Sequence, residues 1–487
     1  MKRLACVALL ATVAFAARPV AERIEALIDS SRSAVQAFWG IRVVNLANGS
    51  VIYSKNDDHF FAPASNTKLF STALALTRLG PDFRFHTSIT TGSEPDANGV
   101  IHGDMRLIGG GDPNLSARIL PYKRDEFGDN PVQALDEMAA QLVARGVRRV
   151  DGDVIGDDTR YVWEPYPDGW SADDAIWEYG AAVSALTLND NAFALHVRPG
   201  ARVGDPAILT LSPRVEELTI HNRTRTTEGG EKKLTYTRIP GSKELVVGGV
   251  IPLAGPNEKM LLAVDDPALF AANALVDALA KLGVSVTGKA AARHRNPEDA
   301  ALAGTGVELA WHDSLPLVEA LRVVDKESQN LHAEIMLREV SRNAGAIGSR
   351  TSGLEELKLF LAEAGIAPKQ YNFEDASGLS RLNLVTPASV SRLLVYMYGS
   401  KYRDAFVSLL PVAGEDGSLN KRFRDAGRGA IHAKTGSLSH VTALSGYMLP
   451  GTGKAYAFSI LVNNYNGKTS EVRAVLDKIA VLLMSGS

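Results

Sequence analysis

Hydrophobic and polar positions change their spacing along the chain, and the first such pattern outlines a small unit near the start. Apolar residues at helical spacing are followed by two short alternating runs and then by a second helical pattern. Asn48-Gly49 between the alternating runs is a strong signal for a tight hairpin. The predicted elements are a helix over Ala21–Phe38, strands over Gly40–Leu46 and Val51–Ser54, and a helix over Ser65–Leu79.

In the last third of the chain, apolar residues again follow helical and strand-like spacing, in the order helices, strands, helix. Helical spacing dominates as far as residue 398, and three strand-like runs and one further helix come after it. The predicted helices cover 314–324, a segment from Asn330, Leu354–Ala364, Pro387–Tyr398 and Ser470–Met484, and the strands cover Ala430–Leu438, Val441–Leu449 and Ala455–Asn463.

The middle of the chain, from Pro81 to about Leu302, has a different texture, with short β-like runs and many Gly and Asp turns. Only two clear helices are predicted there, Pro131–Arg145 and Pro267–Leu282, and each leads into a similar short strand. This echo suggests two similar lobes. A stretch of roughly 220 residues is far too long for a loop, so it is interpreted as an insertion with its own folded parts.

The two chain ends are expected to form one α/β domain, because strands that are close in sequence usually pair. We expect an antiparallel sheet flanked by helices, interrupted by a large and mostly β insertion that forms two extra lobes. The expected boundaries are 17–80 together with 305–487 for this domain, 81–304 for the insertion, and 1–16 for a signal peptide.

The first residues have the layout of a secretory signal peptide. Lys2 and Arg3 precede the apolar run Leu4–Phe15, and Ala14-Phe15-Ala16 offers a cleavage site of small residues. Cleavage would remove Cys6, the single cysteine, which suits an oxidising compartment. We therefore expect an exported protein of the periplasm or cell envelope, soluble or loosely membrane-associated, with no transmembrane anchor in the mature chain.

Composition argues against several classes of function. The formal net charge of −3 shows none of the excess of basic residues that is typical of nucleic-acid-binding proteins. One cysteine is too few for a cysteine-rich zinc site. The ten histidines show no zinc-protease spacing. Gly467-Lys468-Thr469 is not a phosphate-binding loop, because that pattern needs a glycine where Val462 stands. We expect no metal, no cofactor and no nucleic-acid partner.

Ser65-Asn66-Thr67-Lys68 places a hydroxyl and an amine on one face of a predicted helix, about one turn apart. A serine nucleophile needs a base, and a lysine can act as one only if burial or a second cation lowers its pKa. At a helix start, free backbone N–H groups favour developing negative charge. The pair is therefore a candidate for nucleophilic catalysis.

Short patterns of this kind also arise by chance. The S-x-x-K spacing recurs at Ser418–Lys421. The S-x-N pattern occurs at Ser54–Asn56, Ser328–Asn330 and Ser341–Asn343. Lys434-Thr435-Gly436 is rarer, since about 0.1 match is expected in a random chain of this length. Order and setting favour one combination: a serine at a helix start, a serine on an interhelical loop, and K-T-G on a strand.

That ordered trio is the signature of penicillin-recognising serine enzymes. Here it consists of Ser65–Lys68, Ser328–Asn330 and Lys434–Gly436, so the sequence resembles that superfamily. The gap of roughly 260 residues between the first two motifs is similar to that in the class C low-molecular-mass penicillin-binding proteins. This is the D-alanyl-D-alanine carboxypeptidase/endopeptidase family, in which two domains are inserted at this place.

Longer strings extend the resemblance over nearly the whole mature chain. They are Leu107–Pro113, Gly156–Asp158, Val183–Leu186, Asp375–Arg381 and His432–Ser437. Within the fourth string, Asp375 and Ser377 are interpreted as structural. The resemblance implies the fold of a penicillin-recognising serine hydrolase for the domain formed by the chain ends.

The resemblance also implies a role for each motif residue. Ser65 would attack the carbonyl of a D-Ala-D-Ala bond and form an acyl-enzyme, with Lys68 as the base. Ser328 would relay a proton toward the leaving nitrogen, and Asn330 would hold the substrate amide. Lys434 would add positive potential and help to keep Lys68 neutral.

The residues after Lys434 are expected to bind substrate. Thr435, together with Lys434, suits the terminal carboxylate. Gly436 is small enough to let substrate approach the strand. The backbone N–H groups of Ser65 and Ser437 would form the oxyanion hole.

An acidic segment of the insertion, 170–179, supplies further candidates. The family's inserted region contributes an acidic residue that meets the free amine of the stem peptide's third residue. By its distance from Tyr179, Asp174 fits best and Asp173 is the alternative, while a solvated acidic turn is the structural interpretation. Arg381 is a candidate for substrate binding or a surface or structural arginine.

The sequence thus predicts a cell-wall D,D-peptidase that acts on peptidoglycan stem peptides and is acylated by β-lactam antibiotics. Carboxypeptidase action on D-Ala-D-Ala and endopeptidase action on D-Ala-diaminopimelate cross-links both stay open, because both cut after a D-alanine carbonyl. The alternatives are a β-lactamase or esterase on the same fold and an inactive scaffold. The long insertion argues against the first, and the intact motif residues argue against the second.

Overall fold

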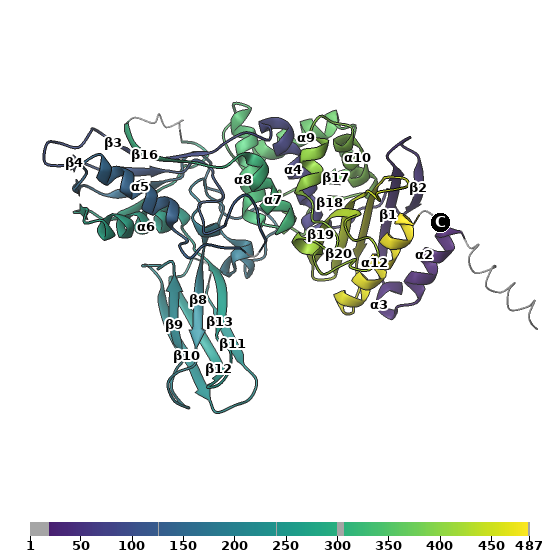
Figure 1. Cartoon of the computed structure of the whole chain (residues 1–487), viewed down its shortest axis with the longest axis horizontal. Coiled ribbons are helices and arrows are strands. Elements are labelled where there is room, and N and C mark those ends of the chain that lie inside the picture. The colour runs from purple at the N-terminus through teal and green to yellow at the C-terminus, as the bar shows by residue number, and fades with distance from the viewer. Residues whose placement is uncertain (1–18, 125, 240, 300–305, 486–487) are drawn as a thin grey trace, which may run out of the picture.

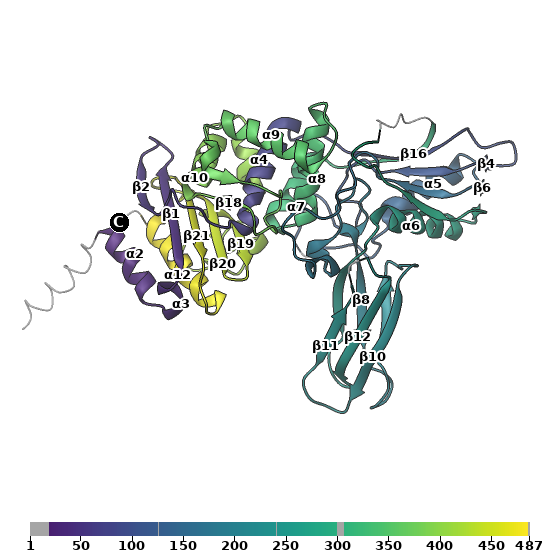
Figure 2. The same cartoon turned by 180° about the vertical axis from the view of Figure 1, so that it is seen from behind.

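The computed structural model describes residues 19–124, 126–239, 241–299 and 306–485, so the expected signal peptide at 1–16 lies outside the described residues. Figures 1 and 2 show two parts that lie side by side. The main domain consists of the elements within residues 20–79 and 317–484. The insertion consists of the elements within residues 86–313.

A five-stranded antiparallel sheet in the order β19-β20-β21-β1-β2 forms the centre of the main domain. β1 pairs with β21 from Phe38 opposite Asn463 to Asn45 opposite Tyr456, so both chain ends meet in one sheet, as predicted. The strands are β1 (Phe38–Asn45), β2 (Val51–Lys55), β19 (Ile431–Leu438), β20 (Val441–Met448) and β21 (Tyr456–Asn463), with a separate short pair β17 (Tyr371–Asn372) and β18 (Leu384–Val385).

The single helix predicted over Ala21–Phe38 is wrong. The structure has two helices there, α2 (Val20–Asp29) and α3 (Arg32–Val35), and β1 follows directly. The buried Trp39 donates its indole N–H to Ala34 O at 2.8 Å, which holds the chain in the turn that leads into the sheet. Tertiary packing of this tryptophan therefore outweighs the local helical pattern.

Helices cover both faces of the sheet (Figure 1). On one face, Leu444 and Ile460 lie in the same buried cluster as Ile479 of α12 (Thr469–Met484). Leu461, the next residue along β21, belongs to a second cluster, formed with the helices of the other face. This separation follows from the alternation of side chains along a strand.

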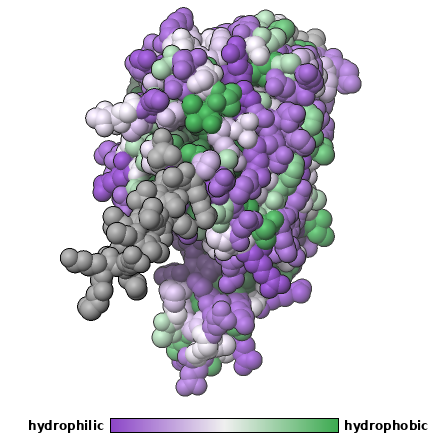
Figure 3. All heavy atoms as spheres, turned by 90° about the vertical axis from the view of Figure 1, so that its right-hand side faces the viewer, coloured by the Kyte–Doolittle hydropathy of each residue, from purple (hydrophilic) through white to green (hydrophobic). Residues whose placement is uncertain are grey.

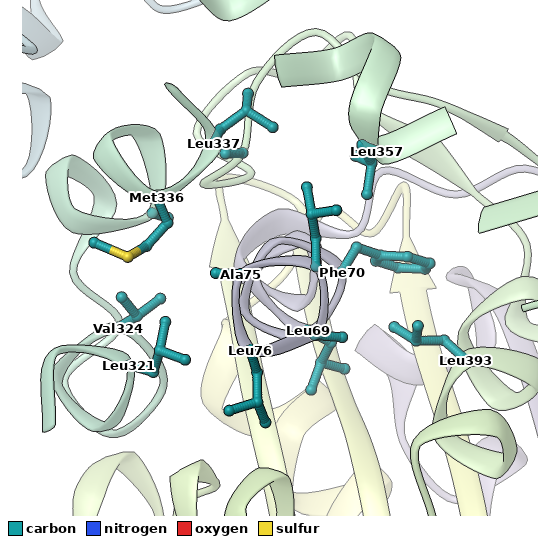
Figure 4. Packing of buried hydrophobic residues seen from close by; sticks show 14 of the residues in the cluster. Leu69, Phe70, Ala75, Leu76, Leu321, Val324, Met336, Leu337, Leu357 and Leu393 are labelled. Carbon is teal, nitrogen blue, oxygen red and sulfur yellow. The ribbon is translucent and has the colours of Figure 1, made fainter. Parts of the chain in front are cut away.

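α4 (Lys68–Leu79) is the central helix of that second layer, and every residue from Lys68 to Leu76 is buried. Figure 4 shows Leu69, Phe70, Ala75 and Leu76 of α4 among Leu321 and Val324 of α7, Met336 and Leu337 of α8, Leu357 of α9 and Leu393 of α10. Burying one Leu or Phe side chain contributes about 1.5–3 kcal/mol, so this packing fixes the start of α4 firmly. The neighbouring helices are α7 (Leu317–Lys326), α8 (Asn330–Asn343), α9 (Arg350–Glu363), α10 (Pro387–Tyr398) and α11 (Arg403–Leu409).

The first lobe of the insertion combines sheets with the two predicted helices, α5 (Gln133–Ala144) and α6 (Pro267–Lys281). One sheet has the order β15-β7-β5-β3-β16 and the other has the order β14-β6-β4. The strands are β3 (His86–Thr91), β4 (Val100–His102), β5 (Met105–Ile108), β6 (Arg149–Asp151), β7 (Val154–Asp157), β14 (Ser285–Val286), β15 (Ala290–Arg293) and β16 (Val307–Asp313).

The second lobe contains two three-stranded sheets, β10-β12-β11 and β13-β8-β9, and extends away from the rest of the molecule in Figure 1. Its chain segment leaves the first lobe after β7 and returns to it before α6. The strands are β8 (Ala192–Arg198), β9 (Ile208–Ser212), β10 (Thr219–Thr227), β11 (Lys233–Thr237), β12 (Glu244–Pro252) and β13 (Glu258–Ala263).

The sequence suggested that the two similar helix–strand units mark two similar lobes, but the structure does not have this arrangement. β14 pairs in parallel with β6, and β15 pairs in parallel with β7, so both units lie in the first lobe. The repeated pattern reflects strands that pair with each other, whereas the second lobe is built differently. The boundaries 17–80, 81–304 and 305–487 stay a prediction.

The surface at the main-domain end is mostly polar, with apolar residues in small scattered groups (Figure 3). Within the described ranges, no helix is both long and apolar enough to cross a membrane. Among the same residues, no group of three or more His, Cys, Asp or Glu side chains is arranged to hold a metal ion.

Candidate active site

The structure brings the two groups of the S-x-x-K motif together at the start of the buried central helix. Ser65 belongs to a 3-10 turn over Ala64–Thr67 that leads directly into α4. Lys68, the first residue of α4, lies with Nζ 3.0 Å from Ser65 Oγ. Ala64 has a φ of +48°, which is uncommon for a residue with a side chain. The backbone therefore bends sharply just before the candidate nucleophile.

Lys68 Nζ has a set of neighbours that suits a neutral amine. Besides Ser65 Oγ, it lies 2.6 Å from Asn330 Oδ1 and 2.6 Å from Ser377 O. Those two oxygens are acceptors only, so they take the two N–H groups of a neutral amine. The remaining lone pair is then free to accept the proton of the Ser65 hydroxyl. This is the arrangement that a general base requires.

The electrostatic surroundings favour the same protonation state. Burial lowers the pKa of Lys68 well below its usual range, and the positive charge of Lys434 lowers this pKa further. Asp375, Asp325 and Glu334 act in the opposite direction. Because the Lys68 side chain is fully buried, loss of hydration is the larger effect.

The second serine and the second lysine also meet. Ser328, between α7 and α8, has a φ of +66°, a conformation that costs of order 1–3 kcal/mol for a non-glycine residue. Lys434 on β19 donates from Nζ to Ser328 Oγ at 2.9 Å and to Thr435 O at 3.0 Å. Since the Ser328 hydroxyl accepts from Lys434, its own proton stays available for another acceptor.

Asn330 begins α8, and its amide is engaged at both ends. Oδ1 accepts from Lys68, and Nδ2 donates to Tyr179 O of the insertion at 2.8 Å. The expected contact of Asn330 with the substrate amide stays a prediction. Asn330 orients Lys68 and ties the insertion to α8, while one N–H and one lone pair of the amide remain for another partner.

The loop that follows β17 supplies the carbonyl that holds Lys68. Asp375 is fully buried and accepts from Ser377 Oγ at 2.7 Å and from Trp170 Nε1 of the insertion at 2.9 Å. Glu334 accepts from the Ser377 N–H at 3.0 Å. Two buried carboxylates thus hold Ser377, whose carbonyl contacts the lysine. The structural interpretation of Asp375 and Ser377 stays a prediction, and these contacts place the Ser377 carbonyl against Lys68.

Ser65, Ser328 and Asn330 open into a cleft of about 510 Å³ between the main domain and the insertion. The cleft is also lined by Gly169, Ser171, Asp173, Asp174 and Tyr179 of the insertion and by Gly378, Leu379, Arg381, Ser437, Leu438 and Ser439 of the main domain. Both candidate acids therefore face the same space as Ser65.

The acidic turn of the insertion is held by its own hydrogen bonds. Asp174 accepts from the Tyr179 hydroxyl at 3.2 Å and from the Ser171 N–H at 3.2 Å, while Asp173 accepts from the Ser171 hydroxyl. That hydrogen bond lowers the pKa of Asp173. Across the cleft, Arg381 donates to a backbone carbonyl, Ser439 O, at 3.1 Å.

β19 is an edge strand and carries the K-T-G motif past the cleft. Ser437 lines the cleft, but the space beside Gly436 is filled by the protein itself, because a Cβ there would lie 2.7 Å from Pro63 O. Gly436 therefore lets β19 pack against the segment before Ser65, a reason that differs from the expected approach of substrate. Thr435 Oγ1 lies 2.8 Å from Ser418 Oγ.

Sequence reasoning missed three residues near this site. Ser418, treated as part of a chance match, contacts the K-T-G threonine, although no local pattern indicates this. Asp325 and Glu334 are buried acids on α7 and α8 that influence the pKa of Lys68, and neither belongs to a motif. The one sequence signal for these residues was that Asp325 lies three residues before Ser328, a residue of the second motif.

Comparisons with known proteins show the family of this chain. A sequence profile described as the D-Ala-D-Ala carboxypeptidase 3 (S13) family matches residues 20–484. A D-alanyl-D-alanine carboxypeptidase of Actinomadura sp. (strain R39) is 34% identical over 466 residues, covering 92% of this chain and 81% of that protein. A penicillin-sensitive carboxypeptidase A of Dictyostelium discoideum is 26% identical over 93% of this chain and 88% of its own.

The fold is also that of a solved relative. The crystal structure of penicillin binding protein 4 (dacB) from Haemophilus influenzae matches with a TM-score of 0.78 at 24% identity, covering 95% of this chain and 98% of the other. This likeness confirms the expected fold class. The profile spans almost the whole chain, including all three motifs. The protein is therefore a serine-type peptidase that belongs to the D-Ala-D-Ala carboxypeptidase 3 (S13) family.

Proposed function

We propose that this protein is a cell-wall D,D-peptidase that cleaves the bond after a D-alanine carbonyl in peptidoglycan stem peptides through an acyl-enzyme on Ser65. The single observation that carries the proposal is the position of Lys68, a fully buried amine 3.0 Å from the Ser65 hydroxyl. Its other two neighbours are acceptors, so its lone pair points at the nucleophile.

Acylation begins when Ser65 Oγ attacks the carbonyl carbon and its proton passes to Lys68 Nζ. The charge that develops on the carbonyl oxygen is stabilised by the backbone N–H groups of Ser65 and Ser437, which both line the cleft. One such donor is worth about 2.7–4 kcal/mol in a comparable site. Asp375 and Glu334 lower the cost of placing a proton on Lys68.

The leaving amine takes its proton from the Ser328 hydroxyl, which Lys434 supports by donating to its oxygen at 2.9 Å. The proton that Lys68 took from Ser65 then replaces it on Ser328, so Lys68 is neutral again. Lys434 and Thr435 attract the carboxylate of the terminal residue. Water then attacks the acyl carbonyl, with Lys68 again as the base, and releases the shortened peptide. A β-lactam acylates the same serine, but the resulting acyl-enzyme is hydrolysed slowly.

The insertion contributes to the choice of substrate. We assign Asp174 to the free amine of the stem peptide's third residue, with Asp173 as the alternative, since both line the cleft that contains Ser65. Arg381 on the opposite side is suited to a peptide carboxylate or carbonyl. These groups bind a peptide end, and the geometry accommodates carboxypeptidase as well as endopeptidase action. The leader-like first residues support export to the periplasm or cell envelope.

The test is intact-protein mass spectrometry after incubation with benzylpenicillin and, separately, with purified muropeptides. We expect one penicilloyl adduct on Ser65 and loss of terminal D-alanine or cut cross-links. Ser65→Ala must abolish both results, whereas Ser54→Ala, an exposed serine on β2, must change neither. Unchanged muropeptides with rapid hydrolysis of penicillin would replace this proposal with a β-lactamase on the same fold.

A further inference from the structure

One buried carboxyl lies beside the two site lysines without a role in the reaction described above. Asp325 belongs to the last turn of α7, three residues before Ser328, and its side chain is fully buried. The Thr72 hydroxyl of α4 faces it, but the proton of that hydroxyl is donated to Lys68 O at 2.7 Å. Among the described residues, neither oxygen of Asp325 therefore accepts a hydrogen bond.

An isolated buried carboxylate without hydrogen bonds is very costly, and burial raises the pKa of Asp325 to about 7. The stabilisation of its charged form must therefore come from nearby positive charge. The cations that act on Asp325 come from three elements: Lys434 on β19, Lys68 on α4 and Lys326 on α7 itself. Lys326 is already engaged, because it pairs with Asp416 and donates to Leu410 O at 3.1 Å.

The remaining two cations differ in their acidic neighbours. Lys68 faces Asp375 and Glu334 as well as Asp325. Lys434 is fully buried, its two hydrogen-bond acceptors are a hydroxyl and a carbonyl, and Asp325 is the one acid that raises its pKa among the described residues. Within the described part of the chain, Asp325 is thus the acid that favours a protonated Lys434.

We propose that Asp325 is a positioning residue of this peptidase: its buried carboxylate is the internal counter-charge that keeps Lys434 protonated beside a neutral Lys68. The inference rests on the proposed function and adds a residue to it. Two buried amines at close range cannot both carry a proton cheaply, and a carboxylate in the same place permits one of them to do so. The protonated amine is Lys434, since Lys68 must be neutral to act as a base.

This role has a consequence for pH dependence. The active form requires neutral Lys68, which sets the acidic limb of the profile, and protonated Lys434, which sets the alkaline limb. Replacing the carboxylate by a neutral amide removes an attraction from both amines, so both limbs move to lower pH. A shift of about one pH unit makes acylation about tenfold slower on the alkaline side.

The experiment compares the second-order rate of Ser65 acylation by fluorescent penicillin between pH 5 and pH 10 in the full-length wild type and in Asp325→Asn. We expect both limbs of the pH profile of the acylation rate to move to lower pH in the variant. KM for a peptide with a free terminal carboxylate should rise at alkaline pH more than KM for its carboxamide. Asp325→Glu, which restores the charge, should return the limbs toward their wild-type positions.

Glu319→Gln is the matched control, since it removes a buried negative charge from the same helix two turns earlier and should leave both limbs in place. A variant profile that is lower at every pH but has unmoved limbs would show that Asp325 only supports packing, and identical profiles would also refute the proposal. If the wild type itself is not acylated, the proposed function fails and the role of Asp325 fails with it.

Discussion

The carboxylate of Asp375 offers the sharpest test of how the fold holds Lys68. It is fully buried and accepts five hydrogen bonds: from Trp170 Nε1 at 2.9 Å, Ser377 Oγ at 2.7 Å, the N–H groups of Gly378 at 2.8 Å and Ser380 at 2.9 Å, and Asn383 Nδ2 at 2.5 Å. Asp375→Asn keeps the shape of the side chain but replaces one acceptor oxygen by a donor.

The magnitude follows from how these bonds divide between the two oxygens. Oδ1 accepts two of them and Oδ2 accepts three, so the amide loses at least two whichever way it is oriented. A hydrogen bond to a charged group is worth about 1.5–3 kcal/mol, which gives a loss of about 3–6 kcal/mol in the free energy of unfolding. Acylation should also slow, because the loop positions the Ser377 carbonyl on Lys68.

Urea-induced unfolding and the rate of penicillin acylation measure the two effects. Ser377→Ala is the graded control, because it removes one donor to the same carboxylate and should cost about 1.5–3 kcal/mol. The reasoning would be refuted if Asp375→Asn were no more destabilising than Ser377→Ala, or if it unfolded earlier yet acylated at the wild-type rate.

Three further predictions concern other parts of the framework. Gly378→Ala should abolish penicillin labelling, because φ is +81° and a Cβ would lie 1.9 Å from the carbonyl oxygen of Ala64, the residue before Ser65. Gly399→Ala, where a Cβ would make only ordinary contacts, should label normally. In a urea titration, Glu339→Gln should lower the free energy of unfolding by about 3 kcal/mol, because this buried carboxylate pairs with Arg160 of the insertion. The exposed Glu355→Gln should have little effect in the same titration. Burial lowers the pKa of His294, but hydrogen bonds to two aspartates outweigh it and raise this pKa to about 10. The imidazolium therefore stabilises the fold fully below its unfolded pKa of about 6.5 and loses this effect as pH rises through about 10, so His294→Gln should be destabilising at pH 6 and nearly neutral above pH 10.5.

The sequence alone determined the features that depend on local spacing. A separation of three positions places Ser65 and Lys68 on one side of a helical turn whatever surrounds them, and alternating residues make 431–438 a strand that carries K-T-G. The chemistry also followed, because a hydroxyl beside an amine at a helix start suits acyl transfer. Element boundaries were less certain, as the break between α2 and α3 shows.

Only the tertiary structure decided how these local pieces meet and which charges are buried together. The pairing of β1 with β21 joins the two chain ends, and packing around α4 brings Lys68 to Asn330 and Ser377, both more than 260 residues away. Such contacts are long-range and leave no periodic trace in the sequence. Burial lowers the pKa of a lysine only when the whole fold removes water from it. The sequence could therefore name Lys68 as a candidate base, but the buried surroundings that lower its pKa and the buried Asp325 became visible only in the folded protein.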